Sequence, residues 1–292
     1  MPLFEEFQHY PALAFFAIVV LGACIGSFLN VVIYRLPIMM FRQWHEDIEV
    51  QQEQTIDLRP DEKIFNLAIP NSRCSKCGTA IKPWQNIPVI SYVFLRGRCA
   101  GCSTPISKRY PLVEAATALA SAYVFHHFGV SVQCLLALVF TWALIALTMI
   151  DYDHQLLPDS ITLPLLWLGL LANSQAVFVP LHEAVYGAAI GYLTLWTVYW
   201  LFRIITGKEG MGFGDFKLLA AAGAWFGWKM LPLIILLSSA VGAVIGVTLI
   251  VLKLQDRTKA IPFGPYLAAA AWIALLFGND LTQWYLNYAK LN

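Results

Sequence analysis

Long runs of apolar residues constrain this chain more than any other feature of its sequence. Hydrophobic residues make up 59% of the 292 positions and charged residues only 13%, whereas a soluble domain has about 25% charged residues. A helix of about 20 apolar residues is long enough to cross the hydrocarbon of a bilayer. The chain is therefore expected to be an all-α protein that crosses a membrane several times, with lipid as its surroundings.

The apolar runs predict about eight transmembrane helices. Their expected positions are residues 12–34, 111–128, 131–150, 158–179, 181–202, 216–228, 230–252 and 264–281. The sixth run is short, and without it the count is seven. The first run is too long for a cleavable signal and has no Lys or Arg before it, so it is interpreted as a retained helix.

The distribution of Lys and Arg predicts the orientation. Residues 35–110 hold eleven of the 19 basic residues, and residues 203–217 and 253–259 hold three each. Only Lys229 and Lys290 fall on the opposite side, a split of 17 to 2. Because basic loops stay in the cytoplasm, the N-terminus is expected in the periplasm and residues 35–110 in the cytoplasm. The split also favours eight spans over seven.

Three domains follow from this arrangement: a first transmembrane helix (1–34), a cytoplasmic loop (35–110) and a membrane bundle (111–292). Within the loop, residues 42–63 are polar and acidic and are expected to form a helix or a mobile linker. Residues 70–110 contain turn residues and four cysteines. So short a segment buries little apolar area and needs a cross-link or a metal to fold.

Two C-x-x-C pairs in this loop have the spacing of a zinc ribbon. Cys74 and Cys77 form the first pair, and Cys99 and Cys102 form the second. Four thiolates complete a tetrahedron around Zn²⁺ and leave no position for a substrate, so the zinc would be structural. Gly78 and Gly101 are expected to provide the open backbone angles of the two turns.

Two disulfides, or a redox pair, are the alternative for these cysteines. The predicted cytoplasmic location argues against disulfides, which are rare in a reducing compartment. Cys24 and Cys134 lie in predicted spans and are expected to be small buried apolar residues.

Several aspartates lie where a membrane protein normally avoids charge. Asp151, Asp153 and Asp159 join the third and fourth predicted spans, and Asp215 precedes the sixth. Carboxylates at such depth are costly and are usually paired or functional. Two of them, brought together from different helices at the cytoplasmic face, would share a proton and activate water as an aspartyl peptidase does.

The remaining candidates have structural alternatives. Gly212 and Gly214 would let the backbone beside Asp215 approach a substrate. Asp159 follows Pro158 at a helix start, where an N-cap role competes with catalysis. Asp153 is either solvated or paired with His154 or a lysine. Lys217 is a supporting candidate, and so is Glu114, which would pair with Arg109 or with a polar group in the bundle.

In order along the chain, these segments resemble the type IV prepilin peptidases, also called leader peptidase/N-methyltransferases. The resemblance covers nearly the whole chain. It rests on Gly22-Ala-Cys-Ile-Gly-Ser-Phe-Leu-Asn-Val-Val-Ile-Tyr-Arg-Leu-Pro37, both cysteine pairs, Arg109-Tyr-Pro-Leu-Val-Glu114, Ile150-Asp-Tyr-Asp with Leu157-Pro-Asp159, Gly212-Phe-Gly-Asp-Phe-Lys217 and Pro262-Phe-Gly-Pro-Tyr-Leu267.

The resemblance implies an activity and its participants. Asp151 and Asp215 would be the catalytic pair of an inner-membrane enzyme that cuts the basic leader of type IV prepilins and type II secretion pseudopilins after a glycine. The new N-terminus would then be methylated from S-adenosylmethionine. The four cysteines match the bifunctional members. Membrane lipid is the other expected partner, and no nucleic acid is expected.

The methyltransferase site is the part that the residues define least, and the cofactor-binding residues stay unassigned. No Gly-x-Gly-x-x-Gly follows a strand, so a cofactor site would form between the cysteine domain, the first span and the bundle. Asn30 and Arg35 are candidates, although packing through Gly22 and Gly26 explains that span without chemistry. The acidic residues 46–62 would attract a basic leader or are simply solvated.

Two other functions compete with the peptidase. A transporter would carry protons or cations on its membrane acids, but it needs polar residues near the bilayer centre and repeated halves. A zinc-ribbon scaffold anchored in the membrane would explain the cysteines and leave the Gly-x-Gly-Asp segment without a purpose.

Overall fold

The computed structural model describes residues 11–47, 65–252 and 261–290. Within these ranges the chain is helical, with nine α-helices and, apart from two isolated bridges, no β-structure. It forms two compact units, Met1–Val130 and Ser131–Asn292. The prediction of an all-α fold is confirmed for the described residues.

The first unit is built on two packed helices, α2 (Pro11–Asp47) and α4 (Arg109–Phe128). A Cβ on Gly26 would lie 2.7 Å from the Cα of Glu114, so small residues on α2 allow the two backbones to approach closely. Between these helices the chain forms a small segment, residues 70–107, with a 3₁₀ turn, η1 (Pro83–Asn86), and the short helix α3 (Ile90–Phe94). We call this segment the tetracysteine module.

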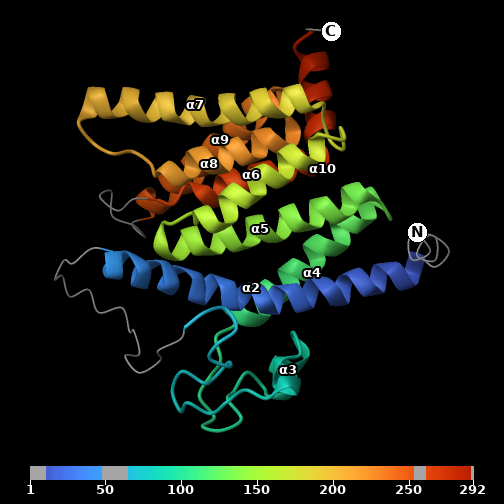
Figure 1. Cartoon of the computed structure of the whole chain (residues 1–292), viewed down its shortest axis with the longest axis vertical. Helices are drawn as coiled ribbons and strands as arrows, with labels where there is room; N and C mark the ends of the chain where they lie inside the picture. The colour runs from blue at the N-terminus through green and yellow to red at the C-terminus, as the bar shows by residue number, and fades with distance from the viewer. Residues whose placement is uncertain (1–10, 48–64, 253–260, 291–292) are drawn as a thin grey trace. The chain divides into compact units, whose positions relative to one another are not determined.

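The second unit is a helical bundle organised around α8 (Figure 1). Its helices are α5 (Val132–His154), α6 (Asp159–Asn173), α7 (Leu181–Thr206), α8 (Phe213–Phe226), α9 (Leu231–Val251) and α10 (Gly264–Tyr288). Helix α8 packs against α6, α7 and α10, and every residue from Asp215 to Phe226 except Lys217 is buried. A helix that is apolar on all sides belongs in the interior, and here it carries one of the two candidate aspartates inward.

Close helix packing in this unit depends on two glycines that face each other. Gly187 of α7 and Gly223 of α8 are in backbone contact, and a Cβ on either would overlap the peptide of the other. This contact fixes the position of α8 along the axis of α7.

Four helices are long and apolar enough to cross a membrane: α2, α5 and α7, together with α9 and the short turn before it. Helices α6 and α8 have only 15 and 14 residues, fewer than the roughly 20 needed to span a bilayer alone. The chain is thus a membrane protein, and the count of eight spans stays a prediction.

The helix boundaries differ from the predicted spans chiefly in three places. Helix α10 ends at Tyr288, seven residues past the predicted end at 281. Helix α2 runs to Asp47, well past residue 34, and passes through Pro37. Helix α6 ends at Asn173, six residues before the predicted end at 179. Part of the predicted acidic segment is therefore helical, and its remainder, residues 48–63, lies outside the described residues, as do the basic residues of 253–259.

Candidate functional site

The four cysteines of the tetracysteine module come together in one cluster. The Sγ atoms of Cys74 and Cys102 are 3.8 Å apart, and those of Cys77 and Cys99 are 3.9 Å apart. All four lie within 4.8 Å of one another. A tetrahedral site with Zn–S bonds of about 2.3 Å places its sulfurs about 3.8 Å apart, so the donor set fits a zinc ion.

Two matching turns present these sulfurs. In the first, the amide of Gly78 donates to the carbonyl of Cys74, and in the second the amide of Ser103 donates to that of Cys99, each at 2.9 Å. Gly78 adopts the expected positive φ of 70°. The expectation for Gly101 is wrong, because Ser103, with φ 56°, takes the left-handed position. Gly101 is instead confined by Thr79, since a Cβ there would lie 2.8 Å from Thr79 Oγ1.

The surroundings of Cys77 favour its thiolate form. Hydrogen bonding with the side chain and backbone of Thr79 lowers the pKa of Cys77 below its ordinary value, to about 6. A deprotonated sulfur is the form that binds metal.

All six cysteines are unpaired, and sulfurs 3.8 Å apart are far beyond the bond length of a disulfide. The disulfide alternative therefore has no support. Cys134 is buried as expected, whereas Cys24 is exposed, so the expectation of burial is wrong for Cys24. Helical periodicity explains the difference, because Cys24 lies away from the face of α2 that Gly22 and Gly26 turn toward α4.

Polar side chains tie the tetracysteine module to the helices of its own unit. Arg35 donates to the carbonyls of Asn66 and Pro70, at 2.9 and 2.6 Å. Asn30 of α2 donates to the Tyr110 carbonyl of α4 at 3.1 Å, which joins the two helices directly. These contacts favour a structural role for both residues over cofactor binding.

Glu114 makes a similar connection from α4. Its Oε2 accepts a hydrogen bond from the amide of Val89, the residue before α3, at 2.7 Å. It also hydrogen-bonds with the Ser27 side chain. These two partners lie before residue 111, so neither belongs to the bundle in which a polar partner for Glu114 was predicted.

In the second unit, Asp151 lies near the C-terminal end of α5 with only 5% of its surface exposed. Its Oδ2 accepts the backbone amide of Gly264, the first residue of α10, at 3.0 Å. The first amides of a helix have no partner within it, and they carry partial positive charge. Asp151 lies near the negative C-terminal end of its own helix, α5, which is unfavourable for a carboxylate. The positive N-terminal end of α10 offsets this.

Asp215 lies in the first turn of α8 and is 6% exposed. Its carboxylate hydrogen-bonds with the backbone of Gly212 and interacts electrostatically with Asp151. Its Oδ1 is buried and has no hydrogen-bond partner among the described residues. The two predicted carboxylates, one from α5 and the other from α8, are therefore close enough within this unit to interact electrostatically.

The glycines beside Asp215 have different surroundings. Gly212 is the N-cap residue of α8, and a Cβ there would meet nothing nearer than 3.9 Å. A Cβ on Gly214 would lie 2.7 Å from the Cβ of Leu157. Packing against Leu157 therefore explains Gly214, and its predicted part in substrate approach stays untested.

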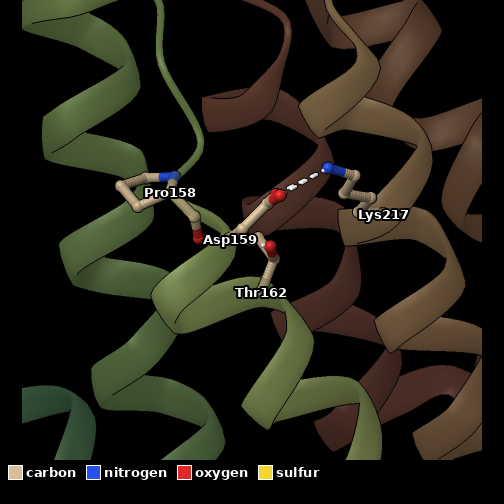
Figure 2. Close-up of polar contacts among 4 residues, drawn as sticks. All are labelled: Pro158, Asp159, Thr162 and Lys217. Carbon is tan, nitrogen blue, oxygen red and sulfur yellow. Dashed lines mark hydrogen bonds and ion pairs between the residues drawn. The ribbon is translucent and has the colours of Figure 1, made fainter. Parts of the chain in front are cut away.

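Asp159 and Lys217 form an ion pair that joins the start of α6 to α8 (Figure 2). Lys217 Nζ lies 2.7 Å from both carboxylate oxygens of Asp159. The predicted N-cap role of Asp159 is wrong, because Pro158 occupies that position and Asp159 is already within the helix. Pro158 provides its carbonyl to Thr162 instead, and the Asp159 side chain turns to α8.

Asp153 is exposed and lies one residue before the end of α5. Sequence analysis assigned no role to Gly264 or Leu157, which contact the two buried aspartates or their neighbours. A signal for Gly264 exists in Pro262-Phe-Gly-Pro265, where a glycine between prolines opens a helix. Leu157 has no comparable signal, because a buried leucine is ordinary in an apolar chain.

Two family models match the chain and together cover most of it. Residues 20–128 match the bacterial peptidase A24 N-terminal domain, and residues 138–247 match the type IV leader peptidase family. No solved structure matches the chain.

Curated relatives match over almost the full length. The chain is 52% identical to a prepilin leader peptidase/N-methyltransferase of Pseudomonas aeruginosa over 99% of both chains. It is 54% identical to one of Stutzerimonas stutzeri and 53% identical to one of Aeromonas hydrophila, each over 98% of this chain and 99% of the relative. The resemblance drawn from the ordered motifs is confirmed, and the chain belongs to the type IV leader peptidase family.

Proposed function

We propose that Asp151 and Asp215 carry out the peptidase reaction of this chain, a prepilin leader peptidase with N-methyltransferase activity. The observation that carries the assignment is that two buried carboxylates, 5% and 6% exposed, come from different helices of one bundle and interact electrostatically. Burying two such groups side by side is costly. Buried carboxylates in a membrane protein usually have a function that compensates for this cost.

The reaction follows from the way two adjacent carboxylates share a proton. The ionised member takes a proton from water, and the water oxygen bonds to the scissile carbonyl carbon. The protonated member donates a hydrogen bond to the carbonyl oxygen and then gives its proton to the leaving amine as the C–N bond breaks. The proton taken from water restores the pair, so no other reactant is consumed.

The four cysteines would hold a structural zinc ion. Their sulfur spacing fits a tetrahedron, and a closed four-sulfur site supplies folding energy rather than a reactive position. Arg35 and Glu114 link this module to α2 and α4 through Pro70 and Val89. Loss of zinc would therefore loosen the whole first unit.

N-methylation draws its methyl group from S-adenosylmethionine, which supplies an electrophilic methyl on a sulfonium sulfur. The acceptor is the amine that peptide cleavage creates, so cleavage must come first. We assign no residue to the cofactor, because Asn30 and Arg35 are engaged by backbone carbonyls. We expect the two units to have different roles: the second unit cleaves the prepilin, and the first contributes to methylation.

The proposed setting is the bacterial inner membrane, with eight spans, a periplasmic N-terminus and catalysis at the cytoplasmic face. The 17 to 2 split of basic residues supports this orientation. We retain the division into residues 1–34, 35–110 and 111–292 as part of the proposal. A basic leader stays on the same face, which brings it to the carboxylates. Prepilins and type II secretion pseudopilins are the proposed substrates.

One assay tests both activities. The purified chain is incubated with a synthetic prepilin and labelled S-adenosylmethionine, and cleavage and label transfer are scored separately. Asp151→Asn and Asp215→Asn should abolish both products from the prepilin but still methylate a peptide that is already cleaved. Cys77→Ser should reduce methylation more than cleavage. Normal cleavage by either Asn variant would contradict the assignment.

A further inference from the structure

Leu157 packs against Gly214, the residue before Asp215, and against Gly264, whose amide donates to Asp151. It is 8% exposed and belongs to the connection between α5 and α6. A Cβ on Gly214 would come within 2.7 Å of the Leu157 Cβ, and a Cβ on Gly264 would come within 3.2 Å of its Cδ1. One leucine thus fills the space that both glycines leave, next to Asp215 on one side and next to the donor of Asp151 on the other.

Gly264 has a second constraint that is polar. Its amide donates to Asp151 Oδ2 at 3.0 Å, and a Cβ at this position would lie 2.6 Å from the same oxygen. No real Cβ lies so near a carboxylate oxygen. Any side chain at 264 must therefore displace either Asp151 or the start of α10.

The carboxylates have few other polar attachments. Asp151 Oδ2 is held by Gly264, while Asp215 is held through the Gly212 backbone and its Oδ1 has no partner in the described part of the chain. None of the ion pairs in the described part of this unit includes Asp151 or Asp215. Backbone contacts and apolar packing therefore have to set the separation of the two side chains.

We propose that Leu157 and Gly264 are positioning residues for the peptidase reaction: the Gly264 amide orients Asp151, and Leu157, seated against Gly214 and Gly264, holds the two carboxylates at their working distance. This inference rests on the proposed roles of Asp151 and Asp215. Both act through the aspartates: Gly264 hydrogen-bonds a carboxylate oxygen of Asp151, and Leu157 acts by packing alone. Their effect on the rate comes from geometry, where a misplacement of about 1 Å can cost roughly 100-fold.

The test uses the full chain and measures kcat and KM for cleavage of a synthetic prepilin. Gly264→Ala should lower kcat by about 100-fold, and Leu157→Ala by about tenfold, both with KM within twofold of the wild type. Leu157→Met, which conserves volume, should retain kcat within about threefold. A purely structural role would reduce the amount of folded protein without lowering kcat per folded molecule at unchanged KM.

Matched controls lie further along α10, away from Gly264. Leu276→Ala removes another buried leucine, 3% exposed, and Gly278→Ala adds a Cβ whose nearest neighbour, at 3.0 Å, is the flexible Met230 sulfur. Both should keep kcat within twofold. Methylation of an already cleaved peptide reports on the integrity of each preparation.

The proposal is overturned if Gly264→Ala or Leu157→Ala cleaves at the rate of its control. If Gly264→Ala fails to fold, the comparison of Leu157→Ala with Leu157→Met and Leu276→Ala decides, and equal rates in these three would overturn it. Normal cleavage by Asp151→Asn would instead refute the proposed function. The two failures are therefore distinguishable.

Discussion

Asn173 holds the far end of the helix that carries Asp215, and its replacement should destabilise the second unit strongly. The side chain is completely buried. Its Nδ2 donates to the carbonyls of Ala224 and Trp225, at 2.8 and 3.0 Å. These are among the last four carbonyls of α8, which have no partner within the helix. Its Oδ1 accepts two further amides, from Phe178 and Val179.

Asn173→Ala leaves all four backbone groups without this partner. At about 1 kcal/mol for each buried group left unpaired, the low end of the usual range, the loss is roughly 4 kcal/mol. For a unit of this size, 1 kcal/mol corresponds to about 2–4 °C in Tm. The melting temperature should therefore fall by about 8–16 °C.

The assay is thermal unfolding of the purified protein in detergent, at one scan rate for all variants. Ser174→Ala is the control, because it changes the next residue, which is exposed and bonds only locally to Leu171. It should shift Tm by less than about 2 °C. A shift for Asn173→Ala no larger than that of Ser174→Ala would refute the reasoning.

Three further outcomes are expected. A double-mutant cycle of Asp159→Asn and Lys217→Met should give a coupling of about 0.5–1 kcal/mol in unfolding, small because the side chains are 55% and 28% exposed; additive effects would mean the ion pair contributes nothing. Metal analysis should find one zinc ion per chain, and a strong chelator should abolish methylation first; intact methylation after complete zinc loss would contradict a structural role. Gly223→Ala should cost about 1–3 kcal/mol in unfolding through its contact with Gly187, whereas Gly246→Ala, which meets only the tip of Ile261 at 3.2 Å, should be nearly neutral.

The sequence predicted the helices and the cysteine cluster because each depends on local or strongly patterned signals. Apolar runs report helices that lipid or a bundle interior must surround. The two C-x-x-C pairs report a cluster because each pair forms a self-contained turn. Cys74 and Cys102, 28 residues apart in sequence, meet at 3.8 Å as the spacing required.

What the sequence could not predict depends on contacts between distant segments. The partner of Asp159 lies 58 residues away on α8, and the donor to Asp151 lies 113 residues away on α10. Uniformly apolar helices carry little information about which faces meet, since almost any face can be buried. The prediction for the second cysteine turn was wrong for a different reason. The open backbone angle was assigned to Gly101, whereas Ser103 has the positive φ in the structure.

The most direct test of the central claim is the rate of prepilin cleavage in three single variants. Asp151→Asn and Asp215→Asn each remove one carboxylate from the buried pair, and Asp153→Asn removes an exposed one two residues from Asp151. The account predicts that the first two lose at least about 1,000-fold in kcat, as expected for a lost general acid or base, while Asp153→Asn stays within about threefold. Cleavage by Asp151→Asn or Asp215→Asn at a rate near that of Asp153→Asn would contradict it.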